Sequence, residues 1–194
     1  MARRVHFPNK ILALLALLVA CSDSNESEQM PVVNAADVKI QAQNGVAFAD
    51  NRPFTGIVYT LWANKKDTAE IVGFRNGVEH GEWKRFYESG KLMERRFFRN
   101  GKKTGDYVAW WSNGRKKLDY HFENGEYHGV CKEWSESGLL LKEMTYKQGY
   151  EEGRQKAFYD NGKVKANYII SEGRRYGLLG TKNCVNVADS VFKN

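Results

Sequence analysis

The sequence predicts an all-β protein: an elongated, single-layered antiparallel sheet of stacked β-hairpins, built from repeats of 24 residues. Three observations predict it. Glycine recurs at this interval in three columns, Asn-Gly or Ser-Gly pairs separate short runs, and apolar and polar residues alternate within those runs. Glycine adopts positive φ without steric cost and marks turns, and alternation with period two is typical of strands. The columns are Gly77, Gly101, Gly125, Gly149 and Gly173; Gly81, Gly105, Gly129, Gly153 and Gly177; and Gly90, Gly114, Gly138 and Gly162.

Each repeat is predicted to contain two strands and two turns. In the first clear repeat, a strand over 82–87 is followed by a turn at 88–91, a second strand over 92–99 and an Asn-Gly turn at Asn100. Asn-Gly between alternating apolar runs is a strong hairpin signal. Five such repeats are predicted over 51–171, and the earliest is looser, with one extra residue at its tip in "ANKKDT".

The segments at both ends differ from the repeats. Residues 1–20 begin with cations and continue with a ten-residue apolar run, which is shorter than the ~20 residues of a spanning helix and is typical of a signal peptide. Residues 21–37 are polar and acidic, which predicts a disordered tether. Residues 38–50 alternate around an Asn-Gly pair and predict an N-terminal cap hairpin. Residues 172–194 predict a partial repeat and a C-terminal cap, because a repeat array must protect its ends.

A short motif closes the predicted signal peptide. The stretch "LVAC", Leu18 to Cys21, resembles the lipobox of bacterial lipoproteins, in which the cysteine is acylated and begins the mature chain. The resemblance implies a lipid on Cys21 that attaches the protein to a membrane of the bacterial cell envelope. Ser22 resembles the sorting residue of proteobacterial outer-membrane lipoproteins, which implies the outer membrane, on its periplasmic or its surface side. Removing the three signal cations lowers the net charge from +7 to +4, too mild a charge to indicate nucleic acid as a partner.

The repeat itself resembles a known family. The stretch "NGVEHGEWKRFYESGKLMERRFFRNG" resembles the MORN repeat variant, which occurs in bacterial proteins labelled YwqK-type antitoxin components of toxin–antitoxin systems. The N-G, G-E-W-K and aromatic-x-x-x-G-K elements occur in order, and the resemblance covers roughly residues 51–180 by the internal-repeat criterion. It implies an elongated sheet of stacked hairpins and no catalytic residues.

Aromatic residues fill two neighbouring columns near the end of each first strand. Regular aromatic stripes are usually packing, so we expect the first column to form a thin core: Phe86, Trp110, Trp134 and Phe158. The next column would then lie on the opposite face among charges, and exposed aromatics beside cations are typical of binding surfaces. The predicted partner-binding strip consists of Tyr87, Trp111 and Tyr159, with nearby Arg85.

The sequence lacks the motifs of an enzyme. We expect no catalytic, metal-binding or cofactor-binding residues, no cofactor and no small-molecule substrate. His80 and His128 share a repeat position that also accepts threonine and glutamate, which indicates a solvated turn rather than a metal site. Cys131 replaces the aromatic residue of earlier repeats and is expected to pack as a small hydrophobe. Two free thiols are favoured over a disulfide with Cys184, because the predicted separation is too long.

Two functional hypotheses follow. The first is a non-enzymatic, lipid-anchored repeat scaffold of the envelope that binds a protein or another envelope partner through its sheet surface. The alternative is an antitoxin-like protein that neutralises a cognate toxin. The two differ in compartment, because an ordinary antitoxin acts in the cytoplasm and the lipobox indicates export.

Overall fold

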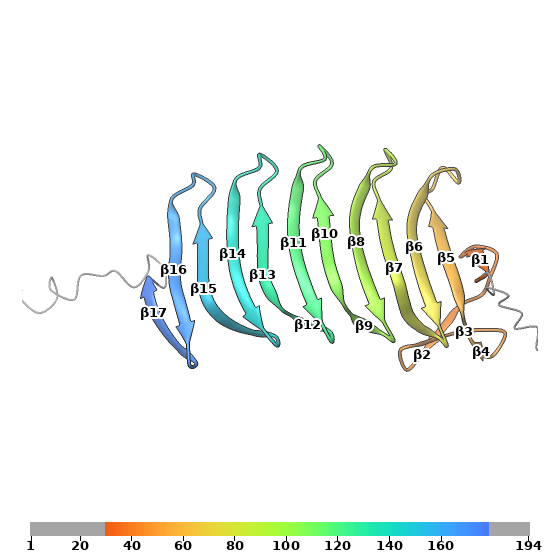
Figure 1. Cartoon of the computed structure of the whole chain (residues 1–194). Coiled ribbons are helices and arrows are strands. Elements are labelled where there is room, and N and C mark those ends of the chain that lie inside the picture. The colour runs from red at the N-terminus through yellow and green to blue at the C-terminus, as the bar shows by residue number, and fades with distance from the viewer. Residues whose placement is uncertain (1–29, 179–194) are drawn as a thin grey trace, which may run out of the picture.

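The chain folds into one long curved sheet with a small second sheet at its N-terminal end (Figure 1). The computed structural model describes residues 30–178, in which every regular element is a strand. In chain order the strands are β1 (Val32–Asn34), β2 (Gln41–Gln43), β3 (Val46–Ala49), β4 (Arg52–Pro53), β5 (Gly56–Leu61), β6 (Thr68–Arg75), β7 (Val78–Phe86), β8 (Leu92–Arg99), β9 (Lys102–Lys103), β10 (Gly105–Trp110), β11 (Lys116–Glu123), β12 (Glu126–Tyr127), β13 (Gly129–Trp134), β14 (Leu140–Lys147), β15 (Tyr150–Phe158), β16 (Val164–Ser171) and β17 (Arg174–Leu178). The predicted all-β fold class is confirmed.

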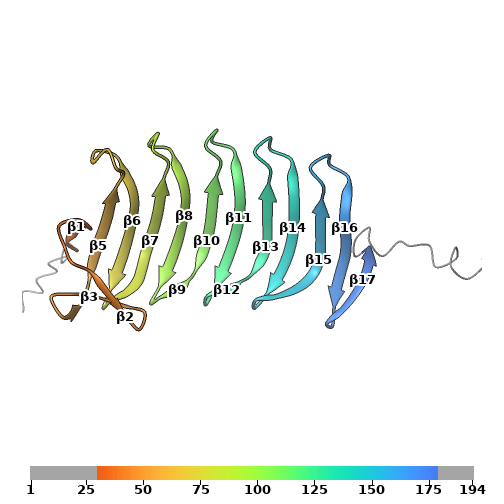
Figure 2. The same ribbon diagram turned by 180° about the vertical axis from the view of Figure 1, so that it is seen from behind.

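The long sheet is a row of hairpins in sequence order. Its strands run β1-β5-β6-β7-β8-β10-β11-β13-β14-β15-β16-β17, with the short strands β9 and β12 pairing with β8 and β11. Each hairpin pairs with the next, so every contact between strands β5 to β17 is antiparallel and local in the chain. Viewed from either side, strands β5 to β17 form a single curved layer, and among the described residues no second layer lies over either face beyond the base of the first hairpin (Figures 1 and 2). Such a sheet must bury its apolar side chains against each other.

The N-terminal edge of the long sheet is covered by β1. Residues 21–37 were expected to be a disordered tether, but Val32, Val33 and Asn34 within that range pair in parallel with Ile57, Val58 and Tyr59 of β5. The prediction was wrong for these residues. The physical reason is that the first hairpin presents an unpaired strand edge, and a short parallel strand satisfies its amide and carbonyl groups.

A small three-stranded sheet, β2-β3-β4, packs at the base of the first hairpin (Figure 1). The amide of Ala47 donates to the carbonyl of Gly77 at 2.7 Å, and the amide of Gly77 donates to the carbonyl of Phe54 at 2.7 Å. The contact requires glycine, because a Cβ on Gly77 would lie 2.3 Å from Cγ1 of Val46 and 2.8 Å from the carbonyl oxygen of Ala47.

The turns at the base of the sheet have the left-handed backbone that the Asn-Gly pairs predict. Asn76 and Gly77 have φ of 50° and 79°, and the same two-residue pattern recurs at the start of every later unit. It persists where the first residue is Gln148 or Glu172, with φ of 51° and 52°. Two consecutive residues with positive φ form the turn whose twist matches that of antiparallel strands. Glutamine and glutamate favour positive φ less than asparagine does, but they can occupy the position before the turn glycine. The strand pairing on both sides of the turn holds them in this conformation.

The buried side chains gather on one face of the sheet, here called the core face. It carries the column Trp83, Tyr107, Cys131 and Gln155 from the first strands, paired with Arg96, Tyr120, Met144 and Tyr168 from the second strands. Trp83, Cys131 and Gln155 of this column are buried, and so are Phe98, Phe122, Tyr168 and Ile170 on the same face. The column that we expected to be the core begins at Phe86 and Trp110, and it is only half-buried. It lies three residues after the buried column in each first strand, at the end of the strand and beside a bulge.

Several expectations concern residues outside the described part of the chain. They are the signal peptide over 1–20, the lipid on Cys21 and the thiol of Cys184. Cys131 is a free thiol in the described residues. Within residues 30–178, no helix is long and apolar enough to span a membrane.

The second glycine column predicts a stability difference that depends on backbone conformation alone. Gly105 has a φ of +65°, and no atom lies within 4 Å of a Cβ built on it. Gly105→Ala should therefore destabilise the fold by about 1–2 kcal/mol, through the left-handed backbone of an L-residue and not through a clash. Gly105→Asn should lose less, since asparagine tolerates this conformation better. Urea unfolding of both variants measures the difference, and equal stability of the Ala variant and the wild type would contradict the explanation.

Candidate partner-binding surface

The predicted strip lies at the tips of the hairpins and not on an open sheet face. The amide of Tyr87 donates to the carbonyl of Lys91, and the amide of Gly90 donates back to the carbonyl of Tyr87, both at 2.9 Å. Trp111 and Tyr159 occupy the same place in their own hairpins and close their turns in the same way. Each strip residue is therefore the first residue of the tip turn in its hairpin.

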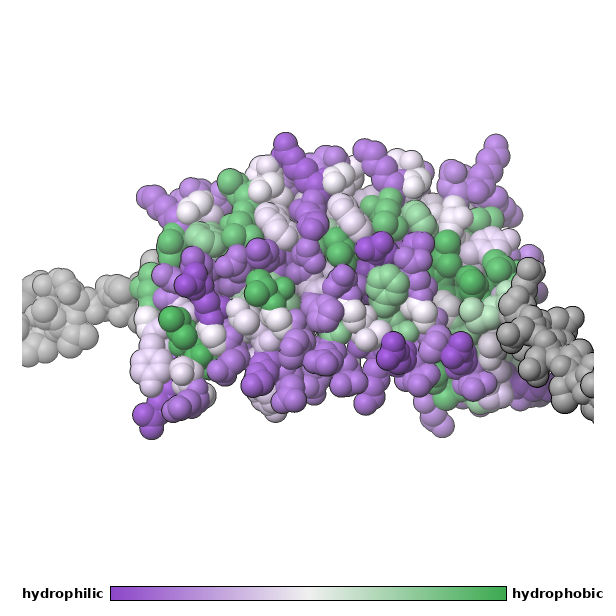
Figure 3. Space-filling view, viewed as in Figure 1, coloured by the Kyte–Doolittle hydropathy of each residue, from purple (hydrophilic) through white to green (hydrophobic). Residues whose placement is uncertain are grey.

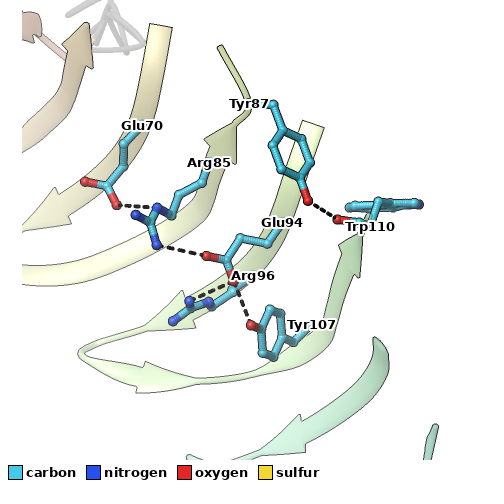
Figure 4. A network of polar contacts seen from close by, with 7 residues as sticks. All are labelled: Glu70, Arg85, Tyr87, Glu94, Arg96, Tyr107 and Trp110. Atoms are coloured by element: carbon cyan, nitrogen blue, oxygen red, sulfur yellow. Dashed lines mark hydrogen bonds and ion pairs between the residues drawn. The ribbon is translucent and has the colours of Figure 1, made fainter. Parts of the chain in front are cut away.

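Two side chains of the strip connect one repeat to the next. The hydroxyl of Tyr87 donates to the carbonyl of Trp110 at 2.8 Å (Figure 4). The indole N–H of Trp111 donates to the carbonyl of Trp134 at 3.1 Å. Both rings are half-buried. Burial is the main cause that raises the pKa of Tyr87, and the charges of Glu136 and Glu94 add to it. A ring that satisfies a neighbouring carbonyl has a structural role, and only its outer surface is available to a partner.

The strip is interrupted along the row of tips. Ser135 occupies the corresponding position in the hairpin between Trp111 and Tyr159. The outer surfaces of the rings also carry lysines: Nζ of Lys117 lies 4.5 Å from the ring centre of Trp111, and Nζ of Lys165 lies 5.8 Å from that of Tyr159. The structure thus places Tyr87 and Trp111 side by side and leaves Tyr159 two repeats away. Their contact with a partner remains a prediction.

Arg85 does not join the strip, because its side chain belongs to an ion-pair network on the core face. Its guanidinium lies 3.8 Å from a carboxylate oxygen of Glu70 and 3.4 Å from one of Glu94 (Figure 4). Glu94 is only 7% exposed and also accepts from Arg96 at 2.9 Å and from the hydroxyl of Tyr107 at 2.6 Å. In this part of the sheet, the network occupies the place that an apolar cluster would fill in a two-layered protein.

The network holds Glu94 in its ionised form. Burial alone would raise the pKa of Glu94, but the hydrogen bonds from Tyr107 and Arg96 and the charges of Arg96 and Arg85 outweigh it and hold the pKa below the ordinary value of 4.5. For Tyr107 the balance runs the other way, because burial and then the hydrogen bond to Glu94 raise its pKa to about 12. At neutral pH the phenol therefore donates and the carboxylate accepts.

Further along the core face the packing becomes aromatic and less complete. Tyr127 contacts Tyr120, Phe122 and Tyr146, with ring centres 5.4, 4.7 and 5.2 Å apart. Beside these rings lies a hollow with a volume of about 220 Å³, over Cys131. Glu133 lies at the same hollow, where it accepts a hydrogen bond from the hydroxyl of Tyr120 and pairs with Lys142 at 3.0 Å.

Exposed apolar side chains are concentrated in the C-terminal half of the sheet. Among the described residues, the large hydrophobic side chains that are exposed lie either at the N-terminal strand or after residue 126. The latter are Tyr127, Val130, Leu139, Tyr150, Tyr159, Val164, Ile169, Tyr176 and Leu178. On the face shown in Figure 3, hydrophobic groups lie between hydrophilic ones and form no single continuous patch.

Four of these side chains share the face opposite the core face. Val130 lies between the core-face residues Gly129 and Cys131, and Ile169 lies between Tyr168 and Ile170. Tyr176 pairs with Ile169, and Leu178 pairs with the next residue on that face, Asn167. This set is called here the C-terminal patch, and its members are Val130 (50% exposed), Ile169 (49%), Tyr176 (55%) and Leu178 (37%).

The described residues contain no group of three or more histidine, cysteine, aspartate or glutamate side chains that could hold a metal ion. His80 accepts a hydrogen bond from the amide of Asn100 at 3.3 Å in the base turn. His121 pairs with Asp106 at 2.8 Å on the solvent-facing side. These contacts assign the two histidines to turn and surface pairing.

The comparison with known families agrees with this geometry. Three segments of the sheet match the MORN repeat variant. They are residues 79–102, 127–148 and 151–168, which correspond to the hairpins β7–β8, β13–β14 and β15–β16. The intervening hairpin β10–β11 has the same register and the same bulge near its tip. The MORN repeat variant is a non-catalytic repeat type. A search of the curated proteins found none that matches the chain significantly.

Sequence reasoning missed the features that distinguish one repeat from another. The Glu94 network was not predicted, although Glu70 and Glu94 stand at one repeat position beside Arg85 and could have signalled it. The hollow was missed because Cys131 was considered only as a small packed residue. The signal was available, since the same position carries a tryptophan and a tyrosine in the two preceding repeats.

The hydrogen bond between the Tyr87 hydroxyl and the next hairpin predicts a small but measurable loss of stability when that hydroxyl is removed. Tyr87→Phe removes the hydroxyl that donates to the carbonyl of Trp110 and should destabilise the fold by about 1 kcal/mol. Tyr150→Phe is the matched control, because Tyr150 is 80% exposed and should tolerate the change. Denaturant unfolding measures both. An equal effect of the two variants would show that the tip bond contributes nothing.

The depressed pKa of Glu94 predicts an acid-dependent stability. A carboxyl whose pKa is lower in the folded than in the unfolded state contributes stability above its unfolded pKa, and that stability is lost as the pH falls through the folded value. Glu94→Gln should therefore be less stable than the wild type above pH 4.5, and the difference should shrink below it. Unfolding at a series of pH values measures this, with the exposed Glu88→Gln as control. A difference that stays constant with pH would contradict the ionised network.

Proposed function

We propose that the protein is a non-enzymatic, lipid-anchored repeat scaffold of the bacterial envelope that binds a protein partner through the surface of its sheet. The observation that carries the proposal is the uneven exposure of apolar side chains along an otherwise regular array. The hairpins β5–β6 and β7–β8 and the network around Glu94 leave no large hydrophobic side chain exposed, whereas the last hairpins expose several. Exposed apolar side chains that cluster over one region favour a protein–protein contact.

The C-terminal patch is the proposed centre of that contact. It joins apolar side chains from β13, β16 and β17, and Arg154 of β15 lies between them, opposite Ile169. Aromatic and aliphatic side chains with an arginine are the composition of the energetically important part of many interfaces. The predicted strip at Tyr87, Trp111 and Tyr159 would then lie beside the contact, at the rim, where its rings are already engaged with the next repeat or with lysines.

The proposed anchor is the lipid on Cys21. Its support is the sequence alone: a basic segment, an apolar run of ten residues and the "LVAC" motif in register. Residue 30, the first that the structure describes, lies nine residues after Cys21 and just before β1. The antitoxin-like alternative has only the family resemblance as support, and the identity of the captured partner decides between the two.

The anchor predicts a change of cellular fraction. Cys21→Ala should leave an unprocessed precursor or move the protein from the membrane to the soluble fraction, because the acyl chains supply the membrane affinity. Fractionation and intact mass of the purified protein measure this. A Cys21→Ala protein that remains processed and bound to the membrane would show that the lipid is not the anchor.

The C-terminal patch predicts a selective loss of binding. Ile169→Lys should reduce capture of the partner from detergent-solubilised membranes by roughly tenfold or more, since it places a charge in an apolar contact, while the melting temperature changes little at this exposed position. Leu139→Lys is the matched control, because Leu139 is equally exposed but lies in a tip turn. If Leu139→Lys lowers capture and Ile169→Lys does not, the contact lies at the tips.

A further inference from the structure

The hollow on the core face has the size and the lining of a binding site for one aromatic ring. Cys131 forms part of its lining, and Tyr120, Tyr127 and Tyr146 surround it together with the thioether of Met144. Its volume of about 220 Å³ exceeds that of an apolar cavity known to bind benzene, about 150 Å³. The volume is sufficient for a single ring and too small for a typical drug-sized ligand.

The hollow exists because one repeat lacks a ring that its predecessors have. The column position that holds Trp83 and Tyr107 holds only a thiol at Cys131. The surrounding rings have not collapsed into the space, because Tyr127 is held against both Tyr120 and Tyr146 by ring contacts at 5.4 and 5.2 Å. What is left is a space of the kind that an aromatic side chain fills elsewhere in this sheet.

A polar group at the hollow indicates what the ring should carry. Glu133 accepts from the hydroxyl of Tyr120 and from Nζ of Lys142 at 3.1 Å, and its second oxygen lies 3.0 Å from the same Nζ. An ionised carboxylate offers about four acceptor positions, so Glu133 retains capacity for a further donor. Burial raises the pKa of Cys131, so the lining beneath the ring is a neutral thiol, which behaves as a small hydrophobic group.

We propose that this hollow binds one aromatic ring that bears a hydrogen-bond donor, a phenol or an indole, with the donor directed at Glu133. The inference rests on the proposed function where the ring is a tyrosine or tryptophan side chain of the partner, which would complete the column at its missing position. A free phenolic or indolic molecule offers the same chemistry. The two sources are separated by the experiment.

The test uses p-cresol, the side-chain analogue of tyrosine, on the full-length protein. Titration followed by the NMR signal of the Met144 methyl group should show saturable shifts in the wild type and in Cys131→Ser, which keeps the hollow. Cys131→Tyr fills the space with the residue of the preceding repeat, and its affinity for p-cresol should fall at least roughly tenfold. Glu133→Gln should weaken p-cresol but not toluene, because only p-cresol has a donor.

The outcomes separate the proposal from the function on which it rests. The ring site is overturned if p-cresol gives no saturable shift, or if Cys131→Tyr binds p-cresol as well as the wild type does. It is also overturned if the hollow prefers tetramethylammonium to p-cresol, because that cation has neither an aromatic ring nor a hydrogen-bond donor. Partner capture by the wild type can still succeed in those cases, and then the proposed function stands alone. If p-cresol binds as expected, loss of partner capture in Cys131→Tyr assigns the ring to the partner, and unchanged capture assigns the hollow to a free molecule.

Discussion

The structure depends on two left-handed backbone features that recur from one repeat to the next. The base turn, such as Asn76-Gly77, reverses the chain with a twist that suits antiparallel strands. The glycine four residues later also has positive φ and interrupts the pairing, as between Val72 and Phe74 opposite β7. A strand with period two would exchange its faces after a slip of one residue. Because both devices recur in the same order, each repeat returns its side chains to the same columns.

A single-layered sheet has no partner layer, and the core face shows how this chain compensates. Around Glu94 the compensation is ionic, with two arginines and a tyrosine on one buried carboxylate. Around Tyr127 it is aromatic. At β15 it is an amide: Gln155 is fully buried, and its side chain bonds the backbone of Thr145 at both N–H and carbonyl. One backbone geometry thus accommodates three kinds of stabilisation, because each repeat needs to satisfy only its immediate neighbours.

The sequence predicted what repeats and missed what does not. Glycine columns, base turns and the face that carries Phe98 and Phe122 follow from backbone conformation and period two, which act locally. The location of the buried column did not follow, because the bulge beside Phe86 breaks the alternation just where the aromatic pairs stand. The sequence predicts that Arg85 contacts a partner, because it is a cation close to the aromatic residues of the strip. Its actual partners, Glu70 and Glu94, come from the strands on either side, and only the register brings them within reach.

The parallel strand β1 has a consequence for reach. It occupies one end of the row and β17 the other, with ten strands between them. At ~4.8 Å per strand, the array holds its two ends roughly 50 Å apart. Each added hairpin would extend that separation by about 10 Å without altering either end, so the number of repeats sets the distance between the two ends independently of what either end binds.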